Sequence, residues 1–331
     1  MAMVTFRDQI AANKRASFWL VLFFILFTAA LAVILAIAFT SMMSGRATWD
    51  EIRSGSIVGV IAAAIAFAFC FFAYFAGDSL VLGVSGAQEI QRSDDPELFN
   101  VVEEVSIAAG VPMPRIYIMH DAALNAFATG RDPKHGIVAI TSGLRQRLTR
   151  DELQGVMAHE MGHIRNFDIR LMLLLAVLIG VIVMLSDFFW RAMRSGAFWG
   201  RSSNSSSSRS SSSSSGKNDG AGLIIAVLII VAFILSILAP ILAQIIQLAV
   251  SRKREFMADA SAVEFTRNPQ GLIDALKKLS DDNRPLVAAN RGTAHMFIVN
   301  PIKKFSEMSS TMFSSHPPIE ERIRQLELLM K

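Results

Sequence analysis

The chain has 331 residues, of which 52% are hydrophobic and only 18% are charged, and its mean hydropathy is +0.43. Ordinary soluble proteins are less apolar, so the composition excludes that class and favours a membrane protein. The net charge of +4 does not indicate nucleic-acid binding. The single cysteine, Cys70, has no partner for a disulfide bond within the chain.

Four long apolar runs account for this composition. They lie near residues 18–39, 56–75, 171–190 and 221–243. Each has about 20 residues, the length that an α-helix needs to cross the hydrocarbon core of a bilayer. One such run could be a buried core helix, but four in one chain favour four transmembrane helices. The first run is too long for a removable signal peptide.

The spans predict two membrane hairpins, residues 1–81 and 169–250, and two polar segments, residues 82–168 and 251–331. An even number of spans separates the polar segments, so they lie on the same side of the membrane and form one domain. In the second run, Gly55 and Gly59 have the GxxxG spacing of closely packed membrane helices. The serine-rich stretch 201–218 has too little apolar surface to fold and predicts a disordered linker on the opposite side.

The first polar segment predicts a small sheet ahead of a helix. Residues 112–119 read as a loop that leads into a short strand. The stretches 124–130 and 136–141 follow, and turn-forming residues separate them. The second polar segment is mostly helical, with loops at Pro301 and at Pro317-Pro318. The predicted fold class is therefore α+β and mostly helical.

The most informative motif is His159-Glu160-Met161-Gly162-His163. On a helix the two histidines lie one turn apart on one face, so both rings can bind a single metal ion. The glutamate between them can take a proton from a water molecule at that metal, as in zinc-dependent peptide hydrolysis. Thr149-Arg150-Asp151-Glu152 is a capping box that predicts the start of this helix. The alternative is a surface helix with solvated histidines.

A catalytic zinc ion usually needs a third protein ligand. This ligand could be a histidine, a cysteine or a carboxylate. Cys70 lies inside a predicted span, which removes it, and the best carboxylate candidate is Glu255, which follows the fourth span closely. The fourth membrane helix is expected to continue through this segment, with Asp259 one turn beyond Glu255. There Asp259 can accept the second N–H of a ligating histidine. In isolation the segment would instead be a juxtamembrane helix with balanced charges.

Several motifs together resemble those of the HtpX-type membrane metalloproteases. In chain order they are residues 124–130, 159–163, 251–259, 293–301 and 315–322. The resemblance covers nearly the whole chain except the serine-rich stretch, which is longer than the usual connection. It implies a zincin-like α+β domain joined to four membrane helices, in a bacterial or archaeal cytoplasmic membrane, with the site facing the cytoplasm.

The resemblance also implies a function, a zinc endopeptidase that cleaves misfolded or damaged membrane proteins in quality control. One Zn2+ per chain would be held by His159, His163 and Glu255, with Glu160 as general base. His316 or Arg322 would donate to the negative charge that develops beside the zinc. An extended substrate would pair with the backbone of an edge strand formed by Asn125, Ala126, Phe127 and Ala128.

Two alternatives remain open. A CAAX-type prenyl-protein protease uses the same metal motifs but surrounds its site with more membrane helices than four. A membrane scaffold with structural zinc would not need Glu160 beside its first histidine. The expected partners are polypeptide substrates and the lipid bilayer, and the sequence gives no oligomeric state.

Basic residues near the spans give a weak indication of topology. Nine flank the spans on the side of the predicted site: Arg7, Lys14, Arg15, Arg92, Arg165, Arg170, Arg252, Lys253 and Arg254. Seven flank them on the other side: Arg46, Arg53, Arg191, Arg194, Arg201, Arg209 and Lys217. The difference favours a site inside the cell.

Overall fold

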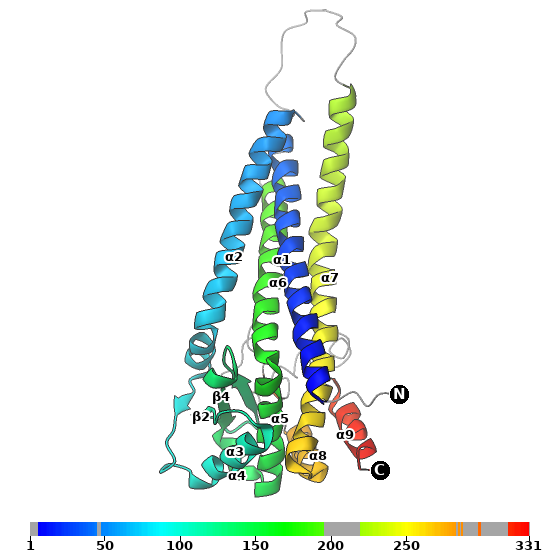
Figure 1. The fold of residues 1–331 in the computed structure, drawn as a ribbon. Helices are drawn as coiled ribbons and strands as arrows, with labels where there is room; N and C mark the ends of the chain where they lie inside the picture. Colours follow the sequence, from blue (N-terminus) through cyan, green and yellow to red (C-terminus); the bar gives the residue numbers. More distant parts are fainter. Residues whose placement is uncertain are drawn as a thin grey trace, which may run out of the picture. The chain divides into compact units, whose positions relative to one another are not determined.

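Helices make up most of the chain in the computed structural model, with one small sheet (Figure 1). The structure describes residues 6–44, 48–194, 219–282, 284, 286, 297–298 and 317–330. The elements in order are α1 (Phe6–Ser44), α2 (Trp49–Ser85), β1 (Gln88–Glu89), α3 (Pro96–Ala109), β2 (Arg115–Met119), β3 (Ala126–Thr129), the 3-10 turn η1 (Pro133–His135), β4 (Ile137–Thr141), α4 (Ser142–Arg147), α5 (Arg150–Asn166), α6 (Asp168–Arg194), α7 (Asp219–Thr266), α8 (Pro269–Asp281) and α9 (Ile319–Leu328). The mostly helical α+β fold expected from the sequence is confirmed.

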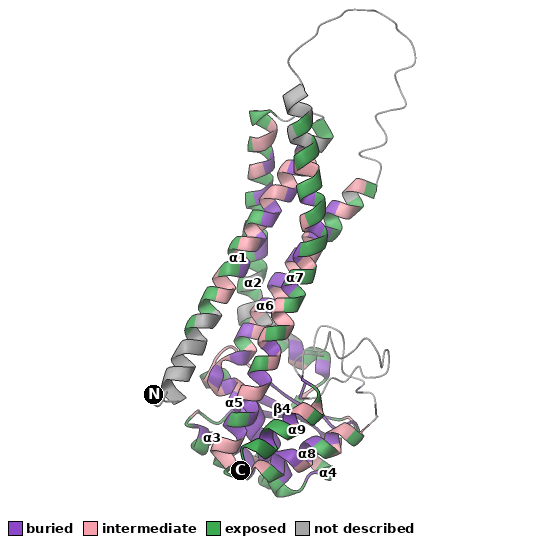
Figure 2. Cartoon of the chain, turned by 90° about the vertical axis from the view of Figure 1, so that its right-hand side faces the viewer, coloured by how far each residue is buried: buried purple, intermediate pink, exposed green. Residues whose placement is uncertain are grey.

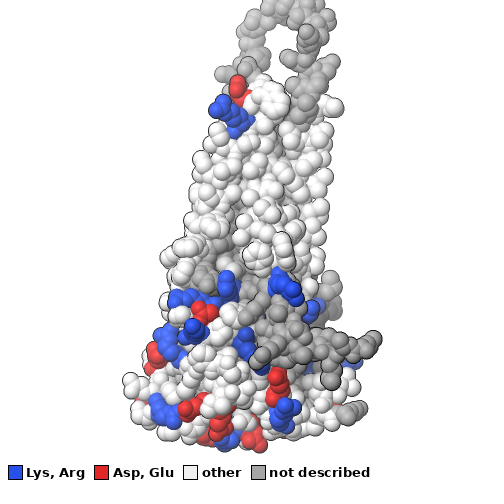
Figure 3. All heavy atoms as spheres, in the orientation of Figure 1, with Lys and Arg blue, Asp and Glu red and all other residues white. Residues whose placement is uncertain are grey.

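Four helices are long and apolar enough to cross a membrane, as the sequence predicts. The candidate spans lie in α1, α2, α6 and α7, at Phe18–Ser41, Trp49–Phe69, Asp168–Arg191 and within Ala226–Thr266. Many large apolar side chains on these helices are exposed, among them Phe69 and Phe71, each at 60%. On the face that Figure 3 shows, these helices carry almost no charge between their ends. Such faces are stable in lipid rather than in water.

The chain divides into two compact units. One contains residues 19–71 and 177–244, and the other contains residues 1–18, 72–176 and 245–331. The domain boundaries at residues 81, 168 and 250 stay predictions. The serine-rich stretch 201–218 and His316 lie outside the described residues.

Small residues let α1 and α2 pack closely in the first of these units. A Cβ atom on Gly59 would lie 2.5 Å from the Cα of Val33, and one on Gly55 would lie 2.6 Å from the Cα of Ile37. Neither distance leaves room for a side chain. The two glycines of the GxxxG pattern therefore allow the close helix contact that this pattern predicts.

The sheet lies in the other unit and has the strand order β1-β2-β4-β3. β2 and β4 run parallel, with Ile116 beside Val138, whereas β1 and β3 pair antiparallel to their neighbours. The two-residue strand β1 and the parallel pairing were not predicted. Every residue of β3 and of β4 is buried.

A hydrophobic core joins the sheet to α3, α5 and α8. It contains Val101 and Val102 of α3, Leu153 and Val156 of α5, and Leu276 of α8, each 0% exposed. Figure 2 shows this part as mostly buried around the sheet, while the long helices carry exposed faces along their length. Truncating one such side chain to alanine costs about 2–5 kcal/mol. This core holds α5, the helix with the two-histidine motif, in a fixed place.

Helix α5 begins and ends at defined caps. The Thr149 hydroxyl accepts from the backbone N–H of Glu152, and the Glu152 carboxylate accepts from the N–H of Thr149, so the predicted capping box is confirmed. At the other end, Phe167 adopts a left-handed conformation with φ of 60°. This conformation is uncommon for a residue with a side chain. It ends α5 so abruptly that α6 begins at the next residue, Asp168.

Candidate metal centre

His159 and His163 lie together on one face of α5, as their spacing predicts. Their Nε2 atoms are 3.2 Å apart, and the rings meet edge to face with centroids 4.7 Å apart. The side chain of His159 is 0% exposed and that of His163 is 14% exposed. Two imidazole nitrogens this close repel each other unless a proton or a metal ion lies between their lone pairs.

Glu255 reaches these histidines from α7. Its Oε1 lies 3.4 Å from Nε2 of His163, and its Oε2 lies 3.7 Å from Nε2 of His159. One ligand atom from each of the three residues lies within 4.8 Å of the others. Two imidazole nitrogens and one carboxylate oxygen form a donor set of catalytic zinc sites. The three residues therefore fit a metal ion.

The approach of α7 depends on two local features. α7 continues unbroken from its apolar run through Glu255 to Thr266, as the sequence predicts. Gly162, inside the motif, gives it room, because a Cβ there would lie 3.2 Å from the Cα of Ala258 and 3.1 Å from the Cβ of Ser261. A larger residue would push α7, and with it Glu255, away from the histidines.

A carboxylate stands behind each histidine. Oδ1 of Asp259 lies 2.9 Å from Nδ1 of His159, and Oδ2 of Asp168 lies 3.1 Å from Nδ1 of His163. A carboxylate in this place accepts the Nδ1–H and leaves Nε2 with the lone pair that a metal ion needs. The sequence predicted that Asp259 accepts a hydrogen bond from a ligating histidine. It did not indicate that this histidine is His159. Asp168 was missed, because its approach depends on the sharp turn at Phe167.

An arginine in turn contacts each carboxylate. Arg322 of α9 is 0% exposed, and its Nε and Nη2 donate to Asp259 at 2.9 and 2.6 Å. Its Nη1 lies 3.2 Å from Oε2 of Glu255. Arg254 of α7 is buried and forms an ion pair with Asp168. The structure thus places Arg322 against the carboxylates of the site, and its predicted contact with a reacting substrate stays a prediction.

Glu160 lies between the two histidines in sequence and is 1% exposed. Burial raises the pKa of Glu160 to about 7, against the opposing effect of His163. The backbone N–H of Ala128 also opposes this shift and lowers the pKa of Glu160. A carboxylate with a pKa near neutrality is suited to accept and return a proton.

β3 is the edge strand next to this site, as the resemblance implied. On its outer side, the carbonyl of Ala126 accepts from the N–H of Ile298 at 2.9 Å, and Phe127 forms an isolated antiparallel bridge with Phe297. The N–H of Ala126 donates to Oδ1 of Asn125 at 3.1 Å. A substrate strand that pairs with β3 must therefore share the Ala126 carbonyl with Ile298 or displace Ile298 from it. The sequence did not indicate that Ile298 contacts β3. Substrate binding at Asn125, Ala126, Phe127 and Ala128 stays a prediction.

Two histidines and a glutamate that fit one metal ion, a buried glutamate beside them and four membrane-length helices define a membrane-bound metallopeptidase. The chain belongs to peptidase family M48, whose pattern matches residues 92–329. It is 40% identical over 331 residues to the "Protease HtpX homolog" of Dictyoglomus turgidum, covering 99% of this chain and 96% of that one. It is 42% identical over 322 residues to the protein of the same name from Listeria innocua, covering 97% and 98%.

A comparison with solved structures found Ste24p from S. mikatae. That match has a TM-score of 0.45 and 21% identity, and it covers 84% of this chain and 65% of the other.

Proposed function

We propose that this protein is a zinc-dependent endopeptidase of a bacterial or archaeal cytoplasmic membrane that cleaves misfolded or damaged membrane proteins. The observation that carries the proposal is the meeting of His159, His163 and Glu255, with Glu160 buried on the same helix. The name of the relatives, protease HtpX homolog, supports a peptidase activity, and the choice of substrate rests on the resemblance to the HtpX-type proteases. On this proposal the unit that contains the metal centre faces the cytoplasm.

Zinc is proposed because its preferred ligands match this donor set, with one ion per chain. Bound there, zinc would act as a Lewis acid and lower the pKa of a water molecule towards neutrality. Asp259 and Asp168 hold the Nδ1 atoms of the two histidines and so keep both Nε2 atoms available as ligands.

Glu160 is proposed to move the proton. Its carboxylate would accept a proton from the attacking water and return it to the amine that leaves when the peptide bond breaks. The site is cationic when loaded, and a nearby cation lowers the pKa of a carboxyl group. A bound metal ion would therefore favour the anionic form of Glu160, which is the form that accepts a proton.

The scissile peptide is proposed to lie beside β3. The influence of the Ala128 backbone N–H on the pKa of Glu160 supports this, because it indicates that the strand backbone lies near the proposed base. His316 and Arg322 remain the proposed donors to the oxyanion. The burial of Arg322 against Asp259 and Glu255 also supports a second role for it, as the group that holds these two carboxylates in place.

A proteolysis assay with the purified full-length protein in detergent tests the proposal. The substrates are an unfolded membrane protein, its folded form and a prenylated peptide. The unfolded protein should be cleaved, a chelator should stop cleavage, and added zinc should restore it. Cleavage that persists in protein shown to contain no metal would overturn the proposed chemistry. Preferential cleavage of the prenylated peptide would instead favour the prenyl-protein protease alternative, and binding of zinc without any cleavage would favour the scaffold.

A further inference from the structure

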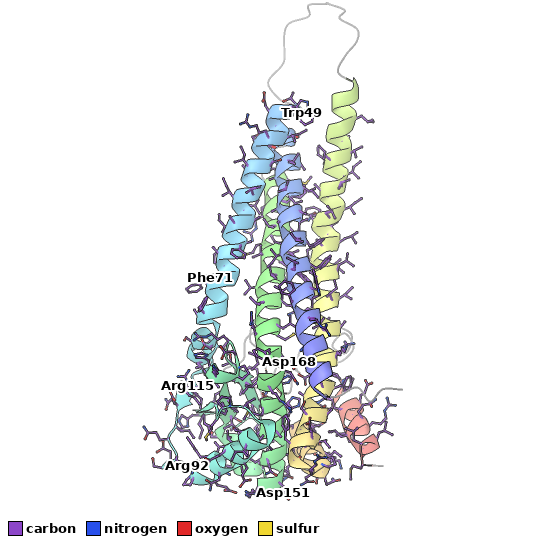
Figure 4. All side chains as sticks on the ribbon, in the orientation of Figure 1. Trp49, Phe71, Arg92, Arg115, Asp151 and Asp168 are labelled. Carbon is purple, nitrogen blue, oxygen red and sulfur yellow. The ribbon has the colours of Figure 1, made fainter. Side chains whose placement is uncertain are left out.

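Asp168 is the first residue of α6 and is 1% exposed. Figure 4 shows it where α6 begins. Its Oδ2 lies 3.1 Å from Nδ1 of His163. Its other oxygen, Oδ1, forms an ion pair with Nη1 of Arg254. The two oxygens of one buried carboxylate therefore contact a proposed metal ligand and a buried cation.

The local backbone explains how Asp168 reaches a residue of the preceding helix. The N–H of Phe167, in its left-handed conformation, donates to the carbonyls of His163 and Ile164 and closes the last turn of α5. The chain then starts α6 at once, so the side chain of Asp168 lies beside the last turn of α5. The short connection leaves the carboxylate little freedom to move relative to the imidazole.

Arg254 offsets the unfavourable desolvation of the Asp168 carboxylate. Removing an ionised carboxylate from water is strongly unfavourable unless an opposite charge and hydrogen bonds replace the lost hydration. Arg254 is 6% exposed and stands on α7 directly before Glu255. One stretch of α7 thus supplies both a proposed metal ligand and the cation that holds Asp168.

We propose that Asp168, held by Arg254, is the positioning residue for His163. It fixes the imidazole with a hydrogen on Nδ1 and with Nε2 towards His159 and Glu255. Asp259 and Arg322 stand in the same order behind His159, so each ligating histidine has its own carboxylate and arginine. The proposal rests on the proposed ligand set. Because Asp168 opens α6 and Arg254 lies on α7, retention of the metal then depends on these two helices meeting at this point.

The affinity for zinc, measured by competition with a chromogenic chelator on the purified full-length protein, tests the proposal. Asp168→Ala should weaken zinc binding by about 10- to 100-fold. Asp168→Asn should weaken it less, because its amide oxygen still accepts from Nδ1–H while its charge is lost. Glu152→Gln is the matched control: it removes a buried carboxylate from the other end of α5, and its zinc affinity should equal that of the wild type.

The visible spectrum of the cobalt-loaded protein gives a second readout, because it reports the geometry of the ligands rather than the stability of the fold. The spectrum should change in Asp168→Ala and Arg254→Gln, recover in Arg254→Lys, and stay unchanged in Glu152→Gln. If Asp168→Ala does not fold, Asp168→Asn and Arg254→Gln decide the question.

His163→Ala tests the proposed ligand set separately from the positioning role of Asp168. It should abolish zinc binding, and if it does not, the proposed ligand set is wrong. If His163→Ala loses the metal while Asp168→Asn and Arg254→Gln match Glu152→Gln in both affinity and spectrum, the ligand set stands and the positioning role of Asp168 is refuted.

Discussion

Several buried charged residues lie around the proposed metal site. Glu160, Glu255, Asp259 and Arg322 are all at most 5% exposed. Charges this deep are rare in protein interiors unless they are paired or serve a function, because desolvation opposes them. Perturbed carboxyl groups next to a potential metal site are typical of catalytic centres. The chemistry of this protein therefore depends on individual residues that can be exchanged one at a time.

Glu160→Gln separates metal binding from proton transfer. Glutamine has nearly the same size and polarity as glutamate but cannot accept the proton of the attacking water. Zinc content should stay at the wild-type level, while kcat should fall by at least about 100-fold. Metal analysis and a peptidase assay on the same preparation measure both. Cleavage near the wild-type rate would remove Glu160 from the mechanism.

Arg322→Lys tests which of the two proposed roles Arg322 has. Lysine keeps the charge but cannot donate to both oxygens of Asp259 at once. If Arg322 holds the carboxylates, as we expect, zinc affinity should fall and the thermal midpoint should drop. A variant with normal zinc affinity and a lower kcat would instead show that Arg322 acts on the transition state alone.

At the scale of elements, α5 is tied to α8 by an ion pair between Glu152 and Lys278, at 2.7 Å. Burial alone would raise the pKa of Glu152, but the hydrogen bond from Lys278 and the backbone N–H of Thr149 lower it below its ordinary value. A carboxyl group with a depressed folded pKa stabilises the fold above its unfolded pKa, about 4.3. That stabilisation is lost as the pH falls through the folded pKa.

Glu152→Gln should therefore lower the thermal midpoint of unfolding at pH 7, by a loss of about 1 kcal/mol or less. The difference from the wild type should shrink as the pH falls below about 4, since the wild-type carboxyl group then becomes neutral too. Glu104→Gln, which removes a more exposed partner of Arg150 on α5, should change the midpoint less. A difference between wild type and Glu152→Gln that is constant from pH 7 to pH 3 would contradict the ion-pair explanation.

The contact between α1 and α2 leads to a second prediction at this scale. Gly59→Ala places a Cβ 2.5 Å from the backbone of Val33, so the two helices must separate and lose van der Waals contact. The thermal midpoint in detergent should fall. Gly180→Ala in α6 is the matched control, because nothing lies within 4 Å of its Cβ. Alanine favours a helix over glycine by about 1 kcal/mol, so Gly180→Ala should be neutral or stabilising.

At the scale of the whole molecule, the orientation in the membrane remains a proposal. The count of flanking basic residues, nine against seven, favours the site inside the cell only weakly, so most of the support comes from the resemblance to HtpX-type proteases. A reporter enzyme fused after Lys331, of a kind that is active only in the cytoplasm, should be active. Activity of a reporter that functions only outside the cytoplasm would reverse the topology.

The sequence by itself determined the features that depend on local spacing. Apolar runs of sufficient length must form helices in a bilayer, because no other structure satisfies the backbone of a single segment in lipid. The four long helices are accordingly found where the sequence predicts them. The capping box at Thr149 and the four-residue spacing of His159 and His163 are local as well, so α5 and the common face of its histidines were predicted. Glu255 could be chosen because it closely follows the fourth apolar run, on a helix expected to continue into the polar domain.

The sequence predicted Asp259 behind a ligating histidine, but only the tertiary structure placed Asp168, Arg254 and Arg322 beside the ligands or their carboxylates. Asp168 reaches His163 because Phe167 adopts a left-handed conformation, and nothing in a single sequence indicates that at a phenylalanine. Arg254 looks like an ordinary surface charge in the sequence, and only the resemblance singled out Arg322, yet both are buried against carboxylates. The backbone N–H of Ile298 likewise donates to the carbonyl of Ala126 in β3, which is far from it in the sequence. These contacts join distant segments, and their partners are set by how the helices pack around one core, a property of the folded chain that no local pattern encodes.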